Sequence, residues 1–213
     1  AFRRSAAVVE MIETDVQRCA SGELVVFHDD TLDRVTDATG EVASTPLSTL
    51  KEASVLGTDE SIPLLTEVFE AVPPDVGLNL ELKGTDVAAD TVDVAARYGH
   101  EVIVSSFQPD EVADARDAGA AAVAYLLYAE EDATNEFDTV EALDVAEDLG
   151  CSYIHPHVHL CLDTEIVERA HGRGLGVNAW TAEGSETVAE LHGRGVDGVV
   201  IDDCELADEC RDE

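Results

Sequence analysis

The sequence predicts an α/β protein, a TIM-type (β/α)8 barrel whose first strand is absent from the 213 residues given. The strongest sign is a unit repeated through the second half, in which a polar, helix-like stretch ends in glycine and a short apolar run follows at once. The glycines are Gly99, Gly119, Gly150, Gly174 and Gly195. Glycine favours the left-handed conformation that ends a helix, and a short apolar run after it is typical of a strand buried on both faces. The spacing of the units, roughly 20 to 30 residues, is that of consecutive βα units.

Seven parallel strands are expected from this pattern and from similar apolar runs upstream. They are residues 11–16, 77–83, 102–107, 121–127, 152–158, 175–180 and 196–202. A helix at residues 1–7 opens the chain, so an eighth strand is expected just before Ala1. The length and an apolar content of 45% suit one well-cored domain over residues 1–213.

One apolar run does not fit the repeat. Residues 24–28 follow the first strand across a short polar turn that has no room for a helix, which indicates a hairpin partner. Residues 36–66 then form an excursion of loop and helix. A doubly wound open sheet remains the alternative architecture.

The charge is extreme, with 47 acidic against 12 basic residues and a net charge of −35. The acids are spread between apolar segments, which indicates a folded protein whose self-repulsion is screened at molar salt. We expect a cytoplasmic protein of a salt-accumulating halophile. Five cysteines without a CxxC pair fit a reducing compartment. The lack of a basic patch disfavours nucleic acid as a partner, and no apolar run is long enough for membrane insertion; the oligomeric state stays open.

Charged residues stand at the ends of two expected strands. Glu13 and Asp15 lie two apart on the first, and Glu81 and Lys83 on the next, so each pair faces one way. Barrel active sites form at these strand ends. Three carboxylates beside a lysine, in a chain with only two lysines, predict a site for a hard divalent cation, Mg²⁺ or Ca²⁺.

A histidine-rich stretch offers a second candidate. His155, His157 and His159 alternate along one expected strand, with Cys151 and Cys161 on either side. Zinc binding is one interpretation. Because Pro156 interrupts the run, we also consider His155 as a minor contact in a substrate pocket.

Several longer motifs run through the chain. They are Met11-Ile12-Glu13-Thr14-Asp15-Val16, Leu24-Val25-Val26-Phe27-His28-Asp29-Asp30-Thr31-Leu32-Asp33-Arg34-Val35-Thr36, Ile62-Pro63-Leu64-Leu65, Leu78-Asn79-Leu80-Glu81-Leu82-Lys83, Ser105-Ser106-Phe107, Asn178-Ala179-Trp180-Thr181 and Gly195-Val196-Asp197-Gly198-Val199-Val200. Together they resemble the glycerophosphodiester phosphodiesterase family, and they occur in family order through essentially the whole chain.

The resemblance implies a TIM-type barrel and a metal-dependent hydrolase that converts glycerophosphodiesters into glycerol 3-phosphate and an alcohol. It implies a divalent cation on Glu13, Asp15 and Glu81. His28 would be the proton-transferring residue and Lys83 would contact the phosphate. Phe107 and Trp180 would line the glycerol or leaving-group side of the site.

The chain departs from the family pattern at both ends. The family opens on a strand that ends in His-Arg-Gly, which is expected before Ala1, and its closing motif Thr-Asp-x-Pro is replaced by Ile201-Asp202-Asp203-Cys204. Two rival functions stay open. One is a related barrel phospholipase of the lysophospholipase D or phosphatidylinositol-specific phospholipase C kind, and the other is a catalytically impaired metal-binding protein.

Overall fold

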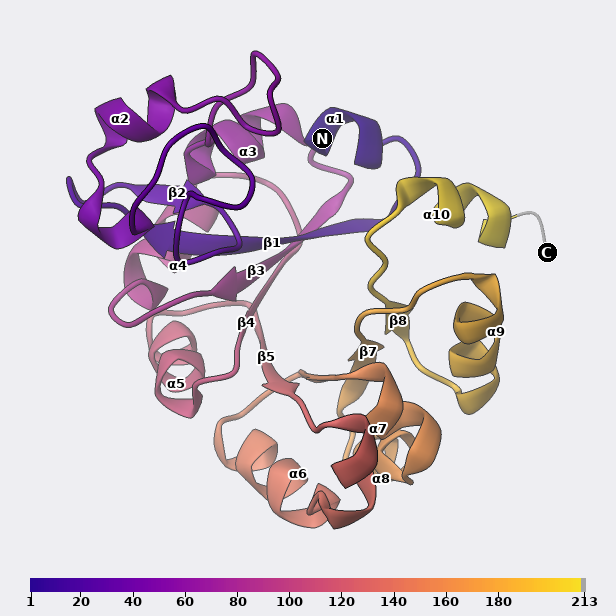
Figure 1. The fold of residues 1–213 in the computed structure, drawn as a ribbon. Helices are drawn as coiled ribbons and strands as arrows, with labels where there is room; N and C mark the ends of the chain where they lie inside the picture. The colour runs from indigo at the N-terminus through magenta and orange to yellow at the C-terminus, as the bar shows by residue number, and fades with distance from the viewer. Residues whose placement is uncertain (212–213) are drawn as a thin grey trace.

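The computed structural model describes residues 1–211, which form a curled sheet with helices around its outer face (Figure 1). Its strands lie in the order β2-β1-β3-β4-β5-β6-β7-β8. Their bounds are β1 Met11–Arg18, β2 Leu24–Val26, β3 Gly77–Leu82, β4 Val102–Ser106, β5 Ala122–Leu127, β6 Tyr153–Pro156, β7 Gly176–Ala179 and β8 Gly198–Val199. Seven of these strands are parallel, and β2 pairs with β1 in the antiparallel sense. The predicted set of seven parallel strands and one hairpin partner is confirmed.

The order of the strands decides between the two architectures considered. A doubly wound sheet reverses its strand order at a switch point. Here the order rises from β1 and β3 to β8 without reversal, so the sheet curls in one direction as in a barrel. Within residues 1–211, β1 and β8 do not pair with each other.

Helices connect the strands and cover the outside of the curl. Their bounds are α1 Phe2–Ser5, α2 Leu47–Glu52, α3 Leu65–Ala71, α4 Ala88–Ala95, α5 Pro109–Asp117, α6 Thr139–Asp148, α7 Val158–Asp163, α8 Ile166–Gly172, α9 Ser185–Arg194 and α10 Cys204–Arg211, with 3-10 turns η1 Val42–Ser44 and η2 Glu131–Glu136. Helices α1 and α10 lie side by side where the sheet is open, joined by an ion pair of 2.8 Å between Arg4 and Glu205 (Figure 1). No described helix is long and apolar enough to cross a membrane.

Two glycines illustrate how the repeat produces this fold. Gly195 ends α9 in the left-handed conformation, with φ 84°, where other residues are strained. Gly198 faces Asn178 so closely that a Cβ atom there would lie 2.5 Å from Asn178 Oδ1. The first glycine turns the chain back to the sheet, and the second leaves room for a side chain of the neighbouring strand.

The core consists of apolar side chains between the sheet and its helices. One cluster packs β1, β3 and β4 against α3, α4 and α5, and a second packs β6 and β7 against α6, α8 and α9. A third lies inside the excursion that follows β2, around Val25, Leu32, Leu50 and Ile62, all of which are fully buried. The excursion is therefore an ordered lobe with its own small core.

Two strands, β6 and β8, are shorter than predicted by three residues or more. β6 ends at Pro156, because α7 begins only two residues later, at Val158, and the pairing beyond Pro156 is a single bridge between His157 and Trp180. His157 precedes this helix and His159 lies within it, so the three histidines do not alternate along one strand as expected. β8 spans two residues, and within residues 1–211 its only strand partner is β7.

Candidate metal and substrate site

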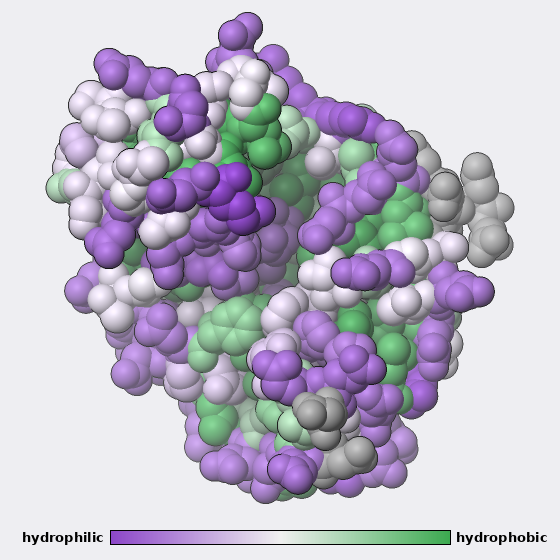
Figure 2. Space-filling model, viewed as in Figure 1, coloured by the Kyte–Doolittle hydropathy of each residue, from purple (hydrophilic) through white to green (hydrophobic). Residues whose placement is uncertain are grey.

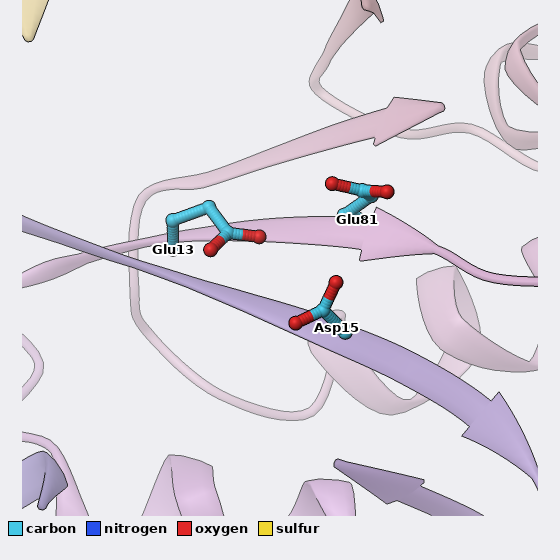
Figure 3. Close-up of side chains that lie close together, drawn as sticks. All are labelled: Glu13, Asp15 and Glu81. Carbon is cyan, nitrogen blue, oxygen red and sulfur yellow. The ribbon is translucent and has the colours of Figure 1, made fainter. Parts of the chain in front are cut away.

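The carboxylates of the predicted cation site converge because of the register between β1 and β3. Asp15 stands directly opposite Glu81, and Glu13 lies two residues earlier on β1, on the same face. Figure 3 shows the three carboxylates turned towards one space between these strands. One oxygen from each lies within 4.8 Å of the other two. This is the only such cluster of potential ligands found in the described part of the chain.

Lys83 joins the same cluster from the end of β3. Its Nζ lies 2.5 Å from Glu81 Oε1 and 3.2 Å from Asp15 Oδ1. Its side chain remains 24% exposed, whereas those of Asp15 and Glu81 are 12% exposed. The ammonium group thus lies on the solvent side of the carboxylates, where an incoming anion would meet it.

Burial of this much negative charge shifts the acid–base equilibria of the cluster. Desolvation, and then the charges of Asp15 and Glu81, raise the pKa of Glu13 well above its usual range. Desolvation also raises the pKa of Glu81 against the opposing effect of Lys83. The pKa of Lys83 is raised because hydrogen bonding and charge from Glu81 and Asp15 outweigh its own desolvation. One lysine therefore does not neutralise three carboxylates.

The residues present fit a divalent cation. Two oxygens bound to one Mg²⁺ or Ca²⁺ at about 2.0–2.6 Å are separated by no more than about 5 Å, and the carboxylates satisfy that limit. Glu13 Oε1 is buried and accepts no hydrogen bond from the described residues, and neither does the nearby Asn79 Oδ1. Carboxylate oxygens are the ligands that hard cations prefer. Such an ion would satisfy the orphaned oxygen and offset the excess negative charge.

His28 lies beside this cluster on the loop that follows β2. Its side chain is 68% exposed, and it lies close enough to Glu81 to oppose, to a small extent, the rise in pKa that burial causes there. Its Nδ1 is hydrogen-bonded to Asp29 Oδ1 at 2.7 Å. Arg34 donates two hydrogen bonds to the same Asp29 carboxylate, at 2.6 and 2.7 Å, and these with His28 hold the pKa of Asp29 far below its usual range. An ionised Asp29 therefore fixes the ring and leaves the other ring nitrogen, Nε2, free to exchange a proton.

A buried glutamine on β1 holds the loop that carries His28 through hydrogen bonds. Gln17, 6% exposed on β1, donates its amide to the carbonyl oxygens of Phe27 at 2.7 Å and Asp29 at 2.9 Å. These bonds tie the loop to the strand that carries the carboxylates. The relative position of His28 and the carboxylate cluster is thus set by β1 itself.

Aromatic rings occupy the opposite half of the same end of the sheet. Trp180, which follows β7, contacts Phe107 after β4 with ring centroids 5.5 Å apart, and Tyr128 after β5 at 6.1 Å. Its ring centroid also lies 5.0 Å from that of His157. Phe107 and Tyr128 are 39% and 47% exposed, so this group of four rings, here named the aromatic mouth, is open to solvent.

His155 lies beneath the aromatic mouth. It is 2% exposed, its Nε2 faces the Asn178 amide at 3.1 Å, and its carbonyl accepts a hydrogen bond of 2.7 Å from the Trp180 indole. Burial lowers its pKa to about 4. The structure therefore places this predicted pocket residue as a support for Trp180. The described residues show no ligand cluster at the histidines and cysteines considered for zinc, and Cys161 is buried in the core.

Three residues near the site were not assigned a role from the sequence, and a fourth, His157, was considered there only as a zinc ligand. Asp29 and Arg34 orient His28, and the signal for them was a carboxylate next to the histidine with an arginine five residues on. Tyr128 and His157 belong to the aromatic mouth. Each directly follows an apolar strand, as Phe107 does, and that shared position could have revealed them.

The fold and the site define the class of protein: an α/β barrel with an acidic cluster at the ends of its strands. The family model for the glycerophosphoryl diester phosphodiesterase family matches residues 1–206. A glycerophosphodiester phosphodiesterase of Caldanaerobacter subterraneus is 30% identical, over 96% of this chain and 87% of that protein. The chain belongs to the glycerophosphoryl diester phosphodiesterase family, whose members are hydrolases.

Solved structures agree on the fold. A phosphodiesterase of Oleispira antarctica, in complex with the product sn-glycerol-3-phosphate, matches with a TM-score of 0.86 at 25% identity, over 100% of this chain and 89% of that one. A glycerophosphodiester phosphodiesterase of Thermotoga maritima matches with a TM-score of 0.83 at 25% identity, over 98% of this chain and 89% of that one. The TIM-barrel fold class predicted from the sequence is confirmed.

Proposed function

We propose that the protein hydrolyses glycerophosphodiesters to glycerol 3-phosphate and an alcohol, at the cluster of Glu13, Asp15, Glu81 and Lys83. The convergence of three carboxylates within 4.8 Å carries this proposal, because a divalent cation held there would supply local positive charge. A phosphodiester anion needs such charge in a protein whose net charge is −35. Family membership and the glycerol phosphate bound by the Oleispira antarctica relative support the substrate class.

Glu13, Asp15 and Glu81 would hold a divalent cation, Mg²⁺ or Ca²⁺. A bound cation of this kind polarises the phosphoryl oxygens and offsets charge that develops on them. Lys83 would donate hydrogen bonds to the phosphate from the solvent side of the cluster, where its Nζ lies. Its exchange of carboxylate partners for phosphate oxygens would keep the ammonium group paired throughout.

His28 would protonate the leaving alkoxide. An alkoxide is far more basic than imidazole, so the departing oxygen needs a proton donor within hydrogen-bond reach. With Nδ1 held by Asp29 at 2.7 Å, the proton to be transferred resides on Nε2. The bidentate contact from Arg34 keeps Asp29 ionised during this transfer.

Phe107 and Trp180 would bind the glycerol or leaving-group portion of the substrate. They belong to the aromatic mouth, with ring centroids 5.5 Å apart, and Phe107 is 39% exposed. His155 would contribute through Trp180, whose indole N–H donates a hydrogen bond of 2.7 Å to the His155 carbonyl oxygen.

Hydrolysis of glycerophosphocholine, followed by release of glycerol 3-phosphate, tests the proposal. The assay is run in molar KCl with Mg²⁺, with Ca²⁺ and with EDTA. Turnover that requires the cation is expected. Lysophosphatidylcholine and phosphatidylinositol serve as comparison substrates, and faster cleavage of either would support the phospholipase alternative. Cation binding by calorimetry without turnover of any substrate would support the catalytically impaired metal-binding protein.

We also propose that the protein works in the reducing, salt-rich cytosol of a halophile. The excess of 35 negative charges supports high salt, and Cys19, Cys151, Cys161 and Cys204 are free thiols. Because the Debye length falls to about 3 Å at molar salt, the melting temperature should rise as KCl increases from dilute buffer. A melting temperature that falls steadily over that range would contradict this proposal.

A further inference from the structure

A cavity of about 370 Å³ adjoins the aromatic mouth, between the ends of β4 and β5 and helix α6. Phe107, Tyr125, Tyr128 and Phe137 contribute aromatic side chains to its lining. Its volume lies near the lower end of the range of small-molecule pockets, about 300–1,000 Å³. Neither the proposed cation site nor the proposed phosphate contact uses this cavity. On the face of the molecule seen in Figure 1, Figure 2 shows apolar surface between stretches of hydrophilic surface.

The charges around the cavity are all negative. Asp138 and Glu141 are the charged residues of its lining, which contains no basic side chain. Asp138 Oδ1 accepts hydrogen bonds from two backbone N–H groups at the start of α6, so its carboxylate is held in place. Tyr128 is hydrogen-bonded to a third carboxylate, that of Glu130, which raises the pKa of the phenol. Aromatic faces beside carboxylates form an environment that favours an organic cation.

The cavity lies within reach of the reacting centre. Ser105 on β4 pairs with Glu81, and Phe107 follows two residues later, just beyond the end of β4 and about 7 Å further along the extended chain. Phe107 is thus both a wall of the cavity and a member of the aromatic mouth. A substrate with its phosphate at Lys83 would direct a short leaving group towards this wall.

We infer that the cavity binds the cationic head of the leaving alcohol, a quaternary or primary ammonium group such as that of choline. The inference rests on the proposed phosphodiesterase activity and narrows its substrates to diesters of amino alcohols. Cation–π contact with Tyr128 and Phe107 and the charge of Glu141 would favour such a head over a neutral one of the same shape.

Binding of choline alone tests the inference without requiring turnover. Choline chloride and its uncharged isostere 3,3-dimethylbutan-1-ol are titrated into the full chain in the same KCl buffer, and binding is followed by NMR. Choline should bind more tightly than the isostere. Tyr128→Leu should weaken choline binding about two- to tenfold. Glu141→Gln should also weaken choline binding, and it should leave the affinity for the uncharged isostere unchanged. Both side chains are exposed, so neither substitution threatens folding.

Asp148→Asn is the matched control, because it removes one exposed carboxylate from the same helix outside the cavity. Equal affinity for choline and its isostere, no binding of either, or equal effects of Glu141→Gln and Asp148→Asn would each overturn the inference. Loss of phosphodiesterase activity in a chain that still binds choline selectively would instead contradict the proposed function and leave the cation pocket standing.

Discussion

The two halves of the site stand at the same end of one sheet and differ in how they are built. Glu13, Asp15 and Glu81 lie on β1 and β3 themselves, in register and largely buried. The aromatic mouth begins one residue beyond β4, β5, β6 and β7 and is substantially exposed. Strands position side chains more rigidly than the loops that follow them. The comparison teaches that the fold fixes the charged chemistry and leaves recognition to residues that can vary without disturbing the sheet.

The largest effect should come from the charged half. Glu81→Gln removes a carboxylate that has Lys83 at 2.5 Å and Asp15 as its neighbour on β1. If the cation contributes several kcal/mol to the transition state, losing it should lower kcat/KM roughly 10⁴-fold or more. Calorimetry should show no tight Mg²⁺ or Ca²⁺ binding in this variant. Glu10→Gln, an exposed change just before β1, should behave as wild type, and unchanged cation affinity in Glu81→Gln would remove the proposed site.

In the same charged half, removing a carboxylate should stabilise the fold when no cation is present, although it should lower activity. The raised pKa of Glu13, caused by burial and then by Asp15 and Glu81, means that its ionised form costs folding free energy. Glu13→Gln should therefore raise the melting temperature in EDTA and lose the stabilisation that wild type gains from added Mg²⁺ or Ca²⁺. A variant that melts lower than wild type in EDTA would indicate that Glu13 has a structural role instead.

Proton transfer should give the next largest effect. His28→Ala should lower the rate about 10²–10⁴-fold on glycerophosphocholine, whose leaving alkoxide needs a proton. The loss should be much smaller on bis(p-nitrophenyl) phosphate, since p-nitrophenolate leaves without protonation. His171→Ala, a change at a histidine that is paired with Asp197 at 2.9 Å outside the site, is the control. Equal losses on both substrates would show that His28 binds or positions the substrate and donates no proton.

The sequence revealed the charged half better than the aromatic half, for a physical reason. Side chains two residues apart on a strand share a face, so Glu13 with Asp15, and Glu81 with Lys83, could be grouped from their spacing alone. Tyr128 and His157 lie where strands give way to loops, and such ends are set by tertiary packing. The burial of His155 likewise depends on Asn178 and Trp180, which are more than 20 residues away and were not paired with it from the sequence. The sequential strand order, by contrast, followed directly from the repeated βα unit.

His155 offers a test of how firmly the aromatic half is supported. Because burial lowers its pKa to about 4, the unfolded chain binds more protons than the folded one between pH 4 and 6.5. Stability should therefore fall as pH decreases through that window, by up to about 3 kcal/mol from this residue. Chemical denaturation of wild type and His155→Gln at pH 7 and pH 4.5 isolates the contribution. A fall of equal size in both proteins would mean that His155 does not remain neutral in the fold.

The smallest effect should come from Trp180, the ring that the other members of the aromatic mouth all contact, at 5.5 Å to Phe107, 6.1 Å to Tyr128 and 5.0 Å to His157. Aromatic contacts are each worth about 0.5–1.5 kcal/mol, so Trp180→Leu should raise KM about two- to tenfold on glycerophosphocholine. The substrate group held there is present before and during the reaction, so kcat should change little. Leu56→Ala, at an exposed side chain in the lobe that follows β2, is the control. If Trp180→Leu instead lowers kcat about 100-fold at unchanged KM, the aromatic mouth positions the reacting groups, and the division between a charged half for chemistry and an aromatic half for recognition does not hold.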